Sequence, residues 1–443
     1  MDEAPSEVVE LIQQLIRNRC VNDGTVASGG EQRNVELLDA FFAGSHLAIE
    51  HYESAPGRGN LVARIEGSDP KAPSLLLMGH TDVVPVNEDR WRNDPFGGEL
   101  IDGEVWGRGA IDMFNLTGSM AYAVRELARS GFKPKGDVIY AAVADEEAGG
   151  TYGADHLLRT ERDAVRADYV ITESGGFPLP GADGTKLPVL VAEKGIGWSK
   201  LRVTGTPGHG SMPFRTDNAL IKAAEVVQRI SDYRPATRIH ESWKGFIQAM
   251  GLPEELSKPL LTEDGYTEAI TGLPLGLSRM AYSCAHTTIT PTTMHAGAKL
   301  NVIPDTVTIE LDIRTLPGDG PDEVRAMIDE AVGNLADQVE IIPGQVHEAT
   351  SSPTDTPLWD AIGRISKRFY EDSSLIPLLM VGATDARFFR NAGSVAYGFG
   401  MFSRKLSMDD LAQMGHGDDE RVDLSSLGMI SEMWDVLIRD FLG

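Results

Sequence analysis

Short apolar segments alternate with amphipathic helical patterns in this 443-residue chain, and this alternation limits the possible folds more than any other feature. Leu75–Met78, Val138–Val143 and Tyr169–Thr172 are predominantly apolar, and each has the length of a strand buried on both faces. A helical pattern over Leu116–Ser130 lies between the first two and ends at Gly131. Buried strands that alternate with helices predict an α/β fold, with a mixed, largely parallel sheet and helices on both faces.

The pattern changes near Gly195. Trp198–Val203 alternates like a half-exposed strand, Asn218–Tyr233 has the period of a long helix, and a strand pair follows over Thr287–Leu300 and Val307–Ile313. This order suits an antiparallel sheet backed by helices, and a chain of this length usually exceeds a single core. We therefore predict a larger domain, residues 1–196 and 316–443, with a smaller α+β domain, residues 197–315, inserted into it.

The composition excludes several classes of protein. The chain has 40 Lys and Arg against 66 Asp and Glu, a formal net charge of −26. Such acidity argues against general nucleic-acid binding and against a polybasic membrane anchor. The apolar runs are too short to span a membrane, and Cys20 and Cys284 cannot build a disulfide framework. No signal peptide is visible in the acidic N-terminal segment, so we expect a cytoplasmic protein.

Residues that bind metals cluster where the buried strands end. The three strands run into Gly79-His80-Thr81-Asp82, Asp145-Glu146-Glu147 and Glu173-Ser174-Gly175-Gly176. Asp112 lies in a glycine-rich segment after the first strand, and His416 lies near the C-terminus. Ligands of open α/β sheets bind beyond the carboxyl ends of the strands, so we expect these side chains to face one site.

Any one of these residues alone is most often a solvated loop side chain. Together, two histidines and three or four carboxylates form the ligand set expected for a pair of divalent metal ions, most naturally zinc. A carboxylate can bridge two such ions ~3.5–4 Å apart, which then share one activated water. The pattern therefore favours a two-metal hydrolytic site.

A second group of candidates lies in the inserted segment. The glycine-rich loop Thr206–Pro213 carries His209, which is either a structural or capping residue or a functional one. Asn301 and Arg314 follow on the adjacent strands. Arg314 is either a surface arginine or a planar fork that binds a substrate carboxylate.

Taken together, these segments resemble the co-catalytic zinc metallopeptidase and amidohydrolase family of carboxypeptidase G, acetylornithine deacetylase, succinyl-diaminopimelate desuccinylase and aminoacylase. The resemblance extends from about Leu11 to Phe441. It rests on four motifs: Gly79-His80-Thr81-Asp82-Val83-Val84-Pro85, Gly107-Arg108-Gly109-Ala110-Ile111-Asp112-Met113, Asp145-Glu146-Glu147 and Gly382-Ala383-Thr384-Asp385-Ala386-Arg387.

The resemblance implies a metal-binding role for five residues. His80 and Glu173 would bind one ion, Glu147 and His416 would bind the second, and Asp112 would bridge the two. A cis peptide bond would follow Asp112.

The resemblance also implies catalytic and substrate-binding roles. Glu146 would be the general base, and Asp82 would orient the ring of His80. His209 would stabilise the oxyanion, which in many members it does by reaching across a dimer. The groups that hold the substrate would be Asn301, Arg314 and Thr384, with Arg314 on the substrate carboxylate.

The activity implied is metal-dependent hydrolysis of an amide bond in an N-acyl amino acid, a small peptide or a related small molecule, by a homodimer formed through the inserted domain. The two ions would be zinc, with cobalt or manganese as alternatives. Deacetylase, desuccinylase, carbamoylase and hydrolytic deaminase activities remain alternatives at the same site. A binding protein without catalysis is disfavoured because no expected ligand is missing. The resemblance implies that the larger domain, residues 1–196 and 316–443, is the catalytic domain and that the inserted one, residues 197–315, is a lid or dimerisation domain. The long segment 235–286 of the inserted domain could line the substrate cleft, extend this lid or alter the dimer contact.

Overall fold

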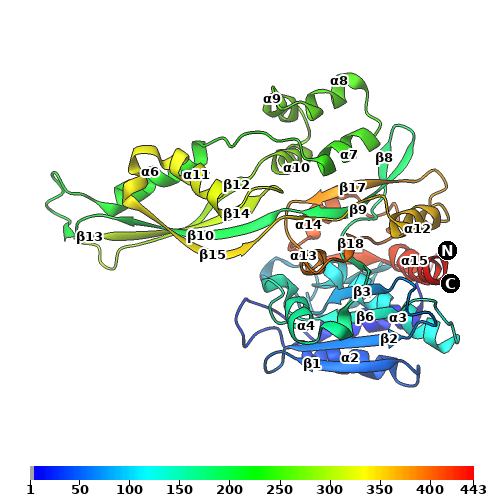
Figure 1. Ribbon diagram of the computed structural model, residues 1–443. Coiled ribbons are helices and arrows are strands. Elements are labelled where there is room, and N and C mark those ends of the chain that lie inside the picture. The colour runs from blue at the N-terminus through cyan, green and yellow to red at the C-terminus, as the bar shows by residue number, and fades with distance from the viewer. Residues whose placement is uncertain (1–3) are drawn as a thin grey trace.

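The structure, a computed structural model, describes residues 4–443, and most of its strands form two sheets (Figure 1). The larger sheet has ten strands, and β8 and β17 join it by pairing with β9. In spatial order the others are β1 (Ala48–Glu53), β2 (Gly59–Ile65), β6 (Val138–Val143), β3 (Leu75–His80), β7 (Tyr169–Thr172), β18 (Val395–Gly398), β9 (Gly184–Glu193) and β16 (Thr350–Ser351), and the two added strands are β8 (Leu179–Gly181) and β17 (Ser374–Met380).

The central strands of the larger sheet are parallel. β3 pairs in parallel with β6 and β7, and β18 pairs in parallel with β7. The strands β1, β2, β8 and β16 pair with their neighbours in antiparallel fashion. Every residue of β3 and of β6 is buried, as expected for a sheet covered on both faces. The predicted fold class, a mixed and largely parallel sheet, is confirmed.

Helices cover both faces of the larger sheet. Successive side chains of a strand point to opposite faces, so the apolar side chains of the buried strands need a covering layer on each face. Leu75 and Leu77 pack in one apolar cluster, and Leu76 and Met78 pack in the other. The first cluster contains α1 (Ser6–Arg17), α2 (Gln32–Phe42), α3 (Asn115–Arg129), α12 (Pro357–Ser366) and α15 (Leu424–Leu442). The second contains α4 (Ala154–Thr160), α5 (Arg162–Val165) and α13 (Ala386–Asn391).

The second sheet has four antiparallel strands: β12 (Thr288–Ala296), β14 (Thr306–Thr315), β10 (Gly195–Thr204) and β15 (Val339–His347). The helices α6 (Ala219–Asp232) and α11 (Pro321–Val332) pack on one of its faces. A short two-stranded antiparallel sheet of β11 (Gly208–His209) and β13 (Val302–Ile303) lies at its outer end. Only Lys194 separates β9 from β10, so one nearly continuous strand joins the two sheets (Figure 1).

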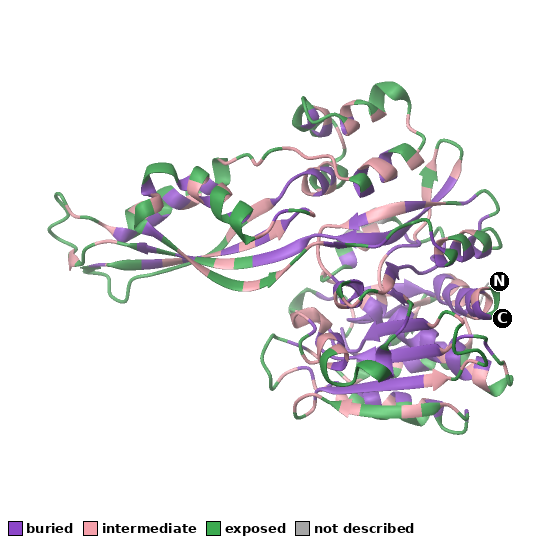
Figure 2. Cartoon of the chain, viewed as in Figure 1, coloured by how far each residue is buried: buried purple, intermediate pink, exposed green. Residues whose placement is uncertain are grey.

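The second sheet and the helices packed on it, together called the second layer, include residues beyond the predicted inserted segment, 197–315. β15 pairs with β10 from Val339 to His347, and α11 shares an apolar cluster with α6. The second layer therefore continues to residue 347. The pattern of β15 is weak in sequence because it is a half-exposed strand at the edge of the sheet and contains Pro343 and Gly344 (Figure 2).

The long segment 235–286 covers part of the larger sheet and does not extend the second one. It contains four helices, and its Trp243 and Phe246 rings stack with centroids 5.6 Å apart. Both rings belong to the apolar cluster that includes Ile376 of β17. The helices are α7 (Glu241–Ala249), α8 (Glu254–Ser257), α9 (Tyr266–Thr271) and α10 (Leu275–Ala285), and Figure 1 shows them above β17.

The remaining elements are a small sheet, one helix and short helical turns. A small sheet is formed by β19 (Arg421–Asp423), β5 (Glu104–Trp106) and β4 (Glu99–Ile101). The helix α14 (Met408–Met414) precedes β19 in the chain. The short helical turns are η1 (Glu88–Arg90), η2 (Ala110–Phe114), η3 (Glu146–Ala148), η4 (Pro259–Leu261) and η5 (Gly333–Gln338). Among residues 4–443, we find no helix with the length and apolarity that a membrane crossing requires.

Candidate metal centre

Five side chains from distant parts of the sequence converge beyond the carboxyl ends of the central strands. His80, Asp112 and Glu173 each place one ligand atom within 4.8 Å of the others, and Asp112, Glu147 and His416 do the same. Asp112 belongs to both groups. Its Oδ1 lies 3.1 Å from His80 Nε2, and its Oδ2 lies 3.4 Å from His416 Nε2. This arrangement fits two metal ions that share one carboxylate.

The parallel strands explain why these residues meet. His80 is the last residue of β3, the Glu146–Ala148 turn follows β6, and Glu173 directly follows β7. Because β3 lies between β6 and β7 in parallel register, the three strands end at one edge of the sheet. Asp112 lies in the η2 turn, and the peptide bond that follows it is cis, as the resemblance implies.

Asp82 contacts the ring of His80 and the backbone of Glu146 and Glu147. Its two carboxylate oxygens accept hydrogen bonds from the backbone amides of Glu146 and Glu147, each at 3.2 Å. Nδ1 of His80 lies 3.0 Å from the Asp82 carbonyl oxygen and 3.6 Å from its carboxylate. A proton on Nδ1 would therefore leave Nε2 of His80 free to bind a metal ion.

Electrostatics at this site favour cation binding. Loss of solvent, and then the charge of Glu173, raises the pKa of Glu146 well above its usual value. Loss of solvent, and then the charge of Asp112, has the same effect on the pKa of Glu173. Hydrogen bonds to Asp112 and Glu147 raise the pKa of His416 to about 10. Divalent ions would stabilise these carboxylates and displace the proton from the histidine, so metal binding should release protons.

Glu420 is a structural partner of the site that sequence reasoning missed. It is fully buried, and its carboxylate accepts hydrogen bonds from the amides of Gly109, Ile111 and Asp112 at 2.8–2.9 Å. Arg108 Nη1 donates to the same carboxylate at 2.7 Å. Its place four residues after His416, in an acidic run, was the only signal in the sequence.

Asp385 is a second residue near the site that sequence reasoning did not assign. Among the described residues, neither of its buried carboxylate oxygens has a hydrogen-bond partner. Burial raises its pKa to about 7, although the charge of Arg387 opposes the shift. A Cβ atom on Gly150 would approach Asp385 Oδ1 to 2.2 Å, so the carboxylate lies against the loop that follows Glu146–Ala148.

Two of the expected substrate-binding residues lie where the two sheets join. Arg314, near the end of β14, donates from Nε to Asp312 Oδ1 at 2.8 Å, and its guanidinium lies 5.6 Å from the centre of the Trp198 ring. Thr384 is buried after β17, and its backbone amide donates to the carboxylate of Glu193. The structure thus places both residues at the base of the second sheet and not at its outer end.

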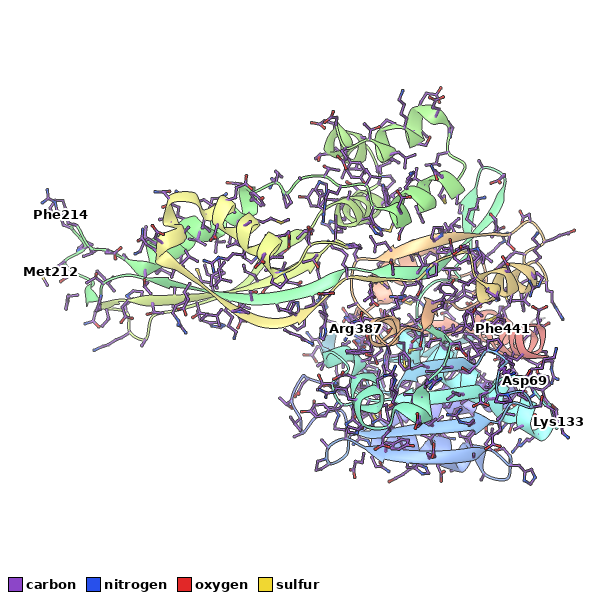
Figure 3. The ribbon with its side chains drawn as sticks, viewed as in Figure 1. Asp69, Lys133, Met212, Phe214, Arg387 and Phe441 are labelled. Carbon is purple, nitrogen blue, oxygen red and sulfur yellow. The ribbon has the colours of Figure 1, made fainter. Side chains whose placement is uncertain are left out.

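His209 and Asn301 lie at the β11–β13 strand pair, at the outer end of the second sheet, and the structure does not bring them to the metal-facing residues of the same chain. The amide of Gly210 donates to the carbonyl of Asn301 at 2.9 Å, and both His209 and Asn301 are exposed. Figure 3 shows the separation: Met212 and Phe214, which follow β11, mark the outer tip, whereas Arg387, which donates to the Gly149 carbonyl beside the site, lies at the larger sheet.

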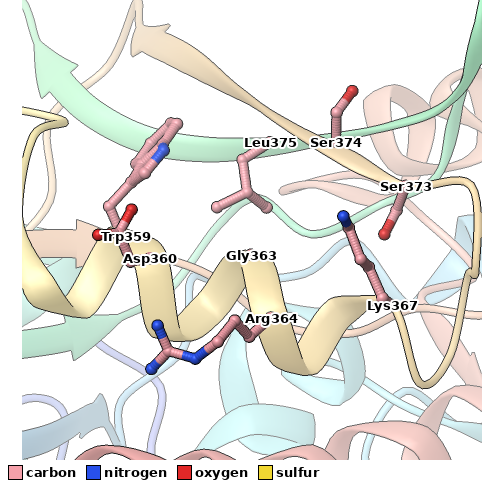
Figure 4. A pocket seen from close by; sticks show the side chains of 8 residues that line it. All are labelled: Trp359, Asp360, Gly363, Arg364, Lys367, Ser373, Ser374 and Leu375. Atoms are coloured by element: carbon pink, nitrogen blue, oxygen red, sulfur yellow. The ribbon is translucent and has the colours of Figure 1, made fainter.

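A separate surface pocket between α12 and β17 is not part of this site. Arg364 in this pocket pairs with Asp440 at 2.6 Å, and the lining contains none of the metal-facing residues. The pocket is lined by Trp359, Asp360, Gly363, Arg364, Lys367, Ser373, Ser374 and Leu375 (Figure 4).

Comparisons with known proteins support this description. The profile of peptidase family M20/M25/M40 matches residues 76–440. The chain is 27% identical to "Probable carboxypeptidase S-like 2" of Dictyostelium discoideum over 86% of this chain and 74% of that protein. It is 28% identical to "Aminoacylase-1" of Pongo abelii over 91% of this chain and 88% of the relative. Among solved structures, the M20 family metallo-carboxypeptidase Sso-CP2 from Sulfolobus solfataricus has a TM-score of 0.73 at 16% identity, and the match covers 100% of this chain and 99% of that one.

The profile covers most of the chain, including every residue assigned to the metal centre. The prediction of a hydrolase that acts on amide or peptide bonds is thereby confirmed. The chain belongs to peptidase family M20/M25/M40.

Proposed function

We propose that this chain hydrolyses the amide bond of an N-acyl amino acid or a small peptide at a pair of divalent metal ions, with zinc as the first candidate. The observation that carries this proposal is the position of Asp112, whose two carboxylate oxygens face His80 and His416. The names of the two sequence relatives, an aminoacylase and a carboxypeptidase-like protein, support this substrate class.

The donor set suits zinc. His80 and Glu173 would hold one ion, Glu147 and His416 the second, and Asp112 both, so each ion would have one imidazole and two carboxylate ligands. Three protein ligands at each ion leave a coordination position for water or substrate. Bound there, the two ions would polarise the substrate carbonyl and lower the pKa of a shared water.

Glu146 is the proposed general base. It is adjacent to Glu147, whose carboxylate pairs with His416 at 3.0 Å, but within residues 4–443 the Glu146 side chain forms no such pair. Glu146 is therefore free to accept a proton from the attacking water and to pass it to the leaving amine. The two neighbouring carboxylates thus have different proposed roles, one in proton transfer and one in metal binding.

Arg314 and Thr384 are proposed to hold the substrate. The guanidinium of Arg314 can bind a carboxylate through two parallel hydrogen bonds, which suits the free carboxylate of an acylated amino acid or of a peptide C-terminus. Asp312 orients the guanidinium through Nε. The position of both residues at the junction of the sheets supports a substrate that lies between the metal centre and the base of the second sheet.

The second sheet is proposed to be the lid and dimerisation domain, in which His209 and Asn301 serve the metal centre of a second copy. His209 is exposed in β11, at the outer end of the second sheet and away from the metal-facing residues of its own chain. Large exposed apolar side chains flank it: Met212, Phe214, Leu300 and Val302. Such a cluster on the surface supports a contact with another protein surface. His209 would then donate a hydrogen bond to the oxyanion formed in the partner's site.

A cytoplasmic location is also proposed. The two cysteines, Cys20 and Cys284, are both free and buried, which fits a reducing compartment. We further propose that the catalytic domain consists of the larger sheet with its helices, and that the segment 235–286 belongs to this domain. The stacked Trp243 and Phe246, packed in the core of the larger sheet, support that assignment.

The test is a hydrolysis screen of the zinc-, cobalt- and manganese-loaded protein against N-acetyl amino acids, N-succinyl amino acids, N-carbamoyl amino acids and dipeptides. We expect turnover of at least one acylated amino acid or dipeptide that carries a free carboxylate, and loss of this turnover in Glu146→Gln. Two bound metals per chain with no hydrolysis of any of these amides would contradict the proposal.

A further inference from the structure

A chain of buried polar side chains behind the metal centre links the N-terminal loop to the backbone that carries Glu146. Its members are almost completely withdrawn from solvent, with exposed fractions of 0–3%. In order, they are Glu31, Arg58, Asp145, Asn22 and Asp82. Buried charges are costly unless they are paired and hydrogen-bonded, so a network of this kind must be closely satisfied to persist.

Arg58 supplies the positive charge of the network. Its guanidinium donates to both carboxylate oxygens of Glu31, at 2.9 and 2.8 Å, and Nη2 also donates to Asp145 Oδ1 at 2.8 Å. The guanidinium lies 5.1 Å from the centre of the Tyr152 ring. Asp145 itself has a left-handed backbone, with φ of 71°, and begins the turn that contains Glu146 and Glu147.

Asn22 joins two carboxylates that would otherwise repel each other. Its Nδ2 donates to Asp82 Oδ2 at 2.9 Å and to Asp145 Oδ1 at 3.0 Å. The side-chain oxygen of Asn22 accepts from the amide of Gly24 at 3.0 Å, which requires the NH₂ group to face the carboxylates. A neutral NH₂ group has two hydrogens, so it can serve both acceptors without adding charge.

The network reaches Glu146 through Asp82. The carboxylate of Asp82 accepts from the amides of Glu146 and Glu147, while Asp145 accepts from the amide of Tyr152 at 3.0 Å, beyond the same turn. Asn22 therefore donates to both of the carboxylates that accept hydrogen bonds from the backbone of this turn and of the segment after it. Its loss would leave Asp82 and Asp145 buried without the donor that they share.

We propose that Asn22 is a positioning residue for Glu146 and for the metal centre, acting through Asp82 and Asp145, with Arg58 as the positive charge of the network. This inference rests on the proposed amide hydrolysis for its kinetic consequence, but its consequence for metal binding does not depend on that function. Outer-shell partners of this kind typically contribute ~10–100-fold to metal affinity or activity.

The test compares three single variants of the full chain. Asn22→Ala removes the shared donor. Asn22→Asp keeps the size of the side chain and adds a third carboxylate, so it should be the more damaging change. Asn34→Ala is the matched control, because Asn34 is also buried but its side chain donates to the backbone carbonyl of Thr81 and not to a carboxylate.

Two readouts distinguish positioning from general packing. Zinc affinity, measured by competition with a chromophoric chelator, should fall ~10–100-fold in Asn22→Ala and further in Asn22→Asp, with Asn34→Ala close to wild type. At saturating zinc, kcat should follow the same order while KM stays nearly constant, because the substrate contacts are not altered. The melting temperature of each variant is measured on the same samples. It should fall by a similar amount in Asn22→Ala and in Asn34→Ala, because each variant loses one buried asparagine side chain.

The proposal is overturned if zinc affinity and kcat of Asn22→Ala stay within about twofold of wild type, or if Asn34→Ala lowers both to the same extent as Asn22→Ala. If wild-type protein hydrolyses no amide, the proposed function fails and the zinc titration still decides the role of Asn22. If either Asn22 variant does not fold, the other provides both readouts. Failure of both to fold, with Asn34→Ala folded, would assign Asn22 to folding and overturn the positioning role.

Discussion

The carboxylate of Glu420 accepts a 2.9 Å hydrogen bond from the backbone amide of Asp112, although 308 positions separate the two residues along the chain. Through this contact the C-terminal part of the larger domain holds the turn that presents Asp112, the proposed bridging ligand. The same carboxylate accepts from two other amides of that turn and from Arg108. The geometry of the proposed metal pair therefore depends on a residue that binds no metal itself.

The first prediction concerns Glu420→Gln. The amide of glutamine presents an NH₂ group where the turn requires an acceptor, and the buried Arg108 loses its counter-charge. We expect metal affinity to fall ~10–100-fold and the melting temperature to drop. The matched control is Asp418→Asn, which alters an exposed pair with Arg90 in the same segment and should cost less than ~1 kcal/mol. Equal metal affinities in Glu420→Gln and wild type, measured by chelator competition, would exclude this role.

The second prediction concerns Glu146→Gln. If Glu146 transfers the proton and does not bind a metal, the variant should retain two metals per chain and lose ~10²–10⁴-fold in kcat. Elemental analysis and steady-state kinetics on the same sample measure both quantities. Glu147→Gln provides the contrast, because it should lower metal content as well as turnover. Near-normal hydrolysis by metal-replete Glu146→Gln would refute its assignment as general base.

The third prediction concerns Asp112→Ala. Because Asp112 faces both histidines, its removal should cost both metals, whereas Glu173→Ala and His416→Ala should each weaken mainly one. Metal content after dialysis against a dilute chelator distinguishes these outcomes. Two retained metals per chain in Asp112→Ala would count against the bridge.

The fourth prediction concerns His209 and uses mixed dimers. Glu146→Gln and His209→Ala should each be nearly inactive alone. If His209 serves the partner's site, mixing the two variants should restore activity, because one site of each mixed dimer combines Glu146 with an intact His209. Random exchange of subunits should give about a quarter of wild-type activity. No recovery after verified subunit exchange would mean that His209 acts within its own chain or not at all.

The fifth prediction concerns the pH dependence of the unfolding free energy, through Lys194, which lies between β9 and β10 where the two sheets join. Lys194 is buried and donates to the His286 carbonyl at 2.8 Å, and burial lowers its pKa to about 7 from 10.5. The folded state therefore holds fewer protons than the unfolded state between these pH values, so stability should rise with pH from about 7 to about 10. The slope is at most ~1.4 kcal/mol per pH unit.

Lys194→Met removes the titrating group and keeps an unbranched side chain. In urea denaturation at pH 7 to 10, the unfolding free energy of wild type should rise relative to that of Lys194→Met. Below about pH 7 the difference should be constant, because Lys194 is then protonated in both states of the wild-type protein. Parallel pH profiles of the two proteins over the whole range would show that Lys194 keeps its ordinary pKa.

Much of the fold and of the candidate centre could be predicted from sequence because the signals are local. Uninterrupted apolar runs such as Leu75–Met78 identify strands buried on both faces, and the residues that follow them must lie at one edge of a parallel sheet. The clustering of candidate ligands at this edge was therefore predictable from their positions, whereas the choice of His80, Asp112, Glu147, Glu173 and His416 as the metal ligands came from the family resemblance. Their roles as metal ligands stay predictions until metal binding is measured.

Other features depend on contacts that no local pattern records. Glu420 and Asn22 act through hydrogen bonds to residues that are distant in sequence, and their polar side chains look like ordinary loop residues. The half-exposed edge strand β15 lacks a clear alternation, so the second layer extended beyond its predicted end. The segment 235–286 has helical patterns that are compatible with either sheet, and only the packing of Trp243 against the larger core decided its place.

The sequence by itself determined which residues form buried strands and which side chains follow them, because burial and strand pairing act on contiguous segments. The tertiary structure decided which distant groups satisfy the buried donors and acceptors, and which sheet each helix covers. Hydrogen-bond partners and packing surfaces are chosen in three dimensions, so the supports of Asp112 and Glu146 became visible only once the chain was folded.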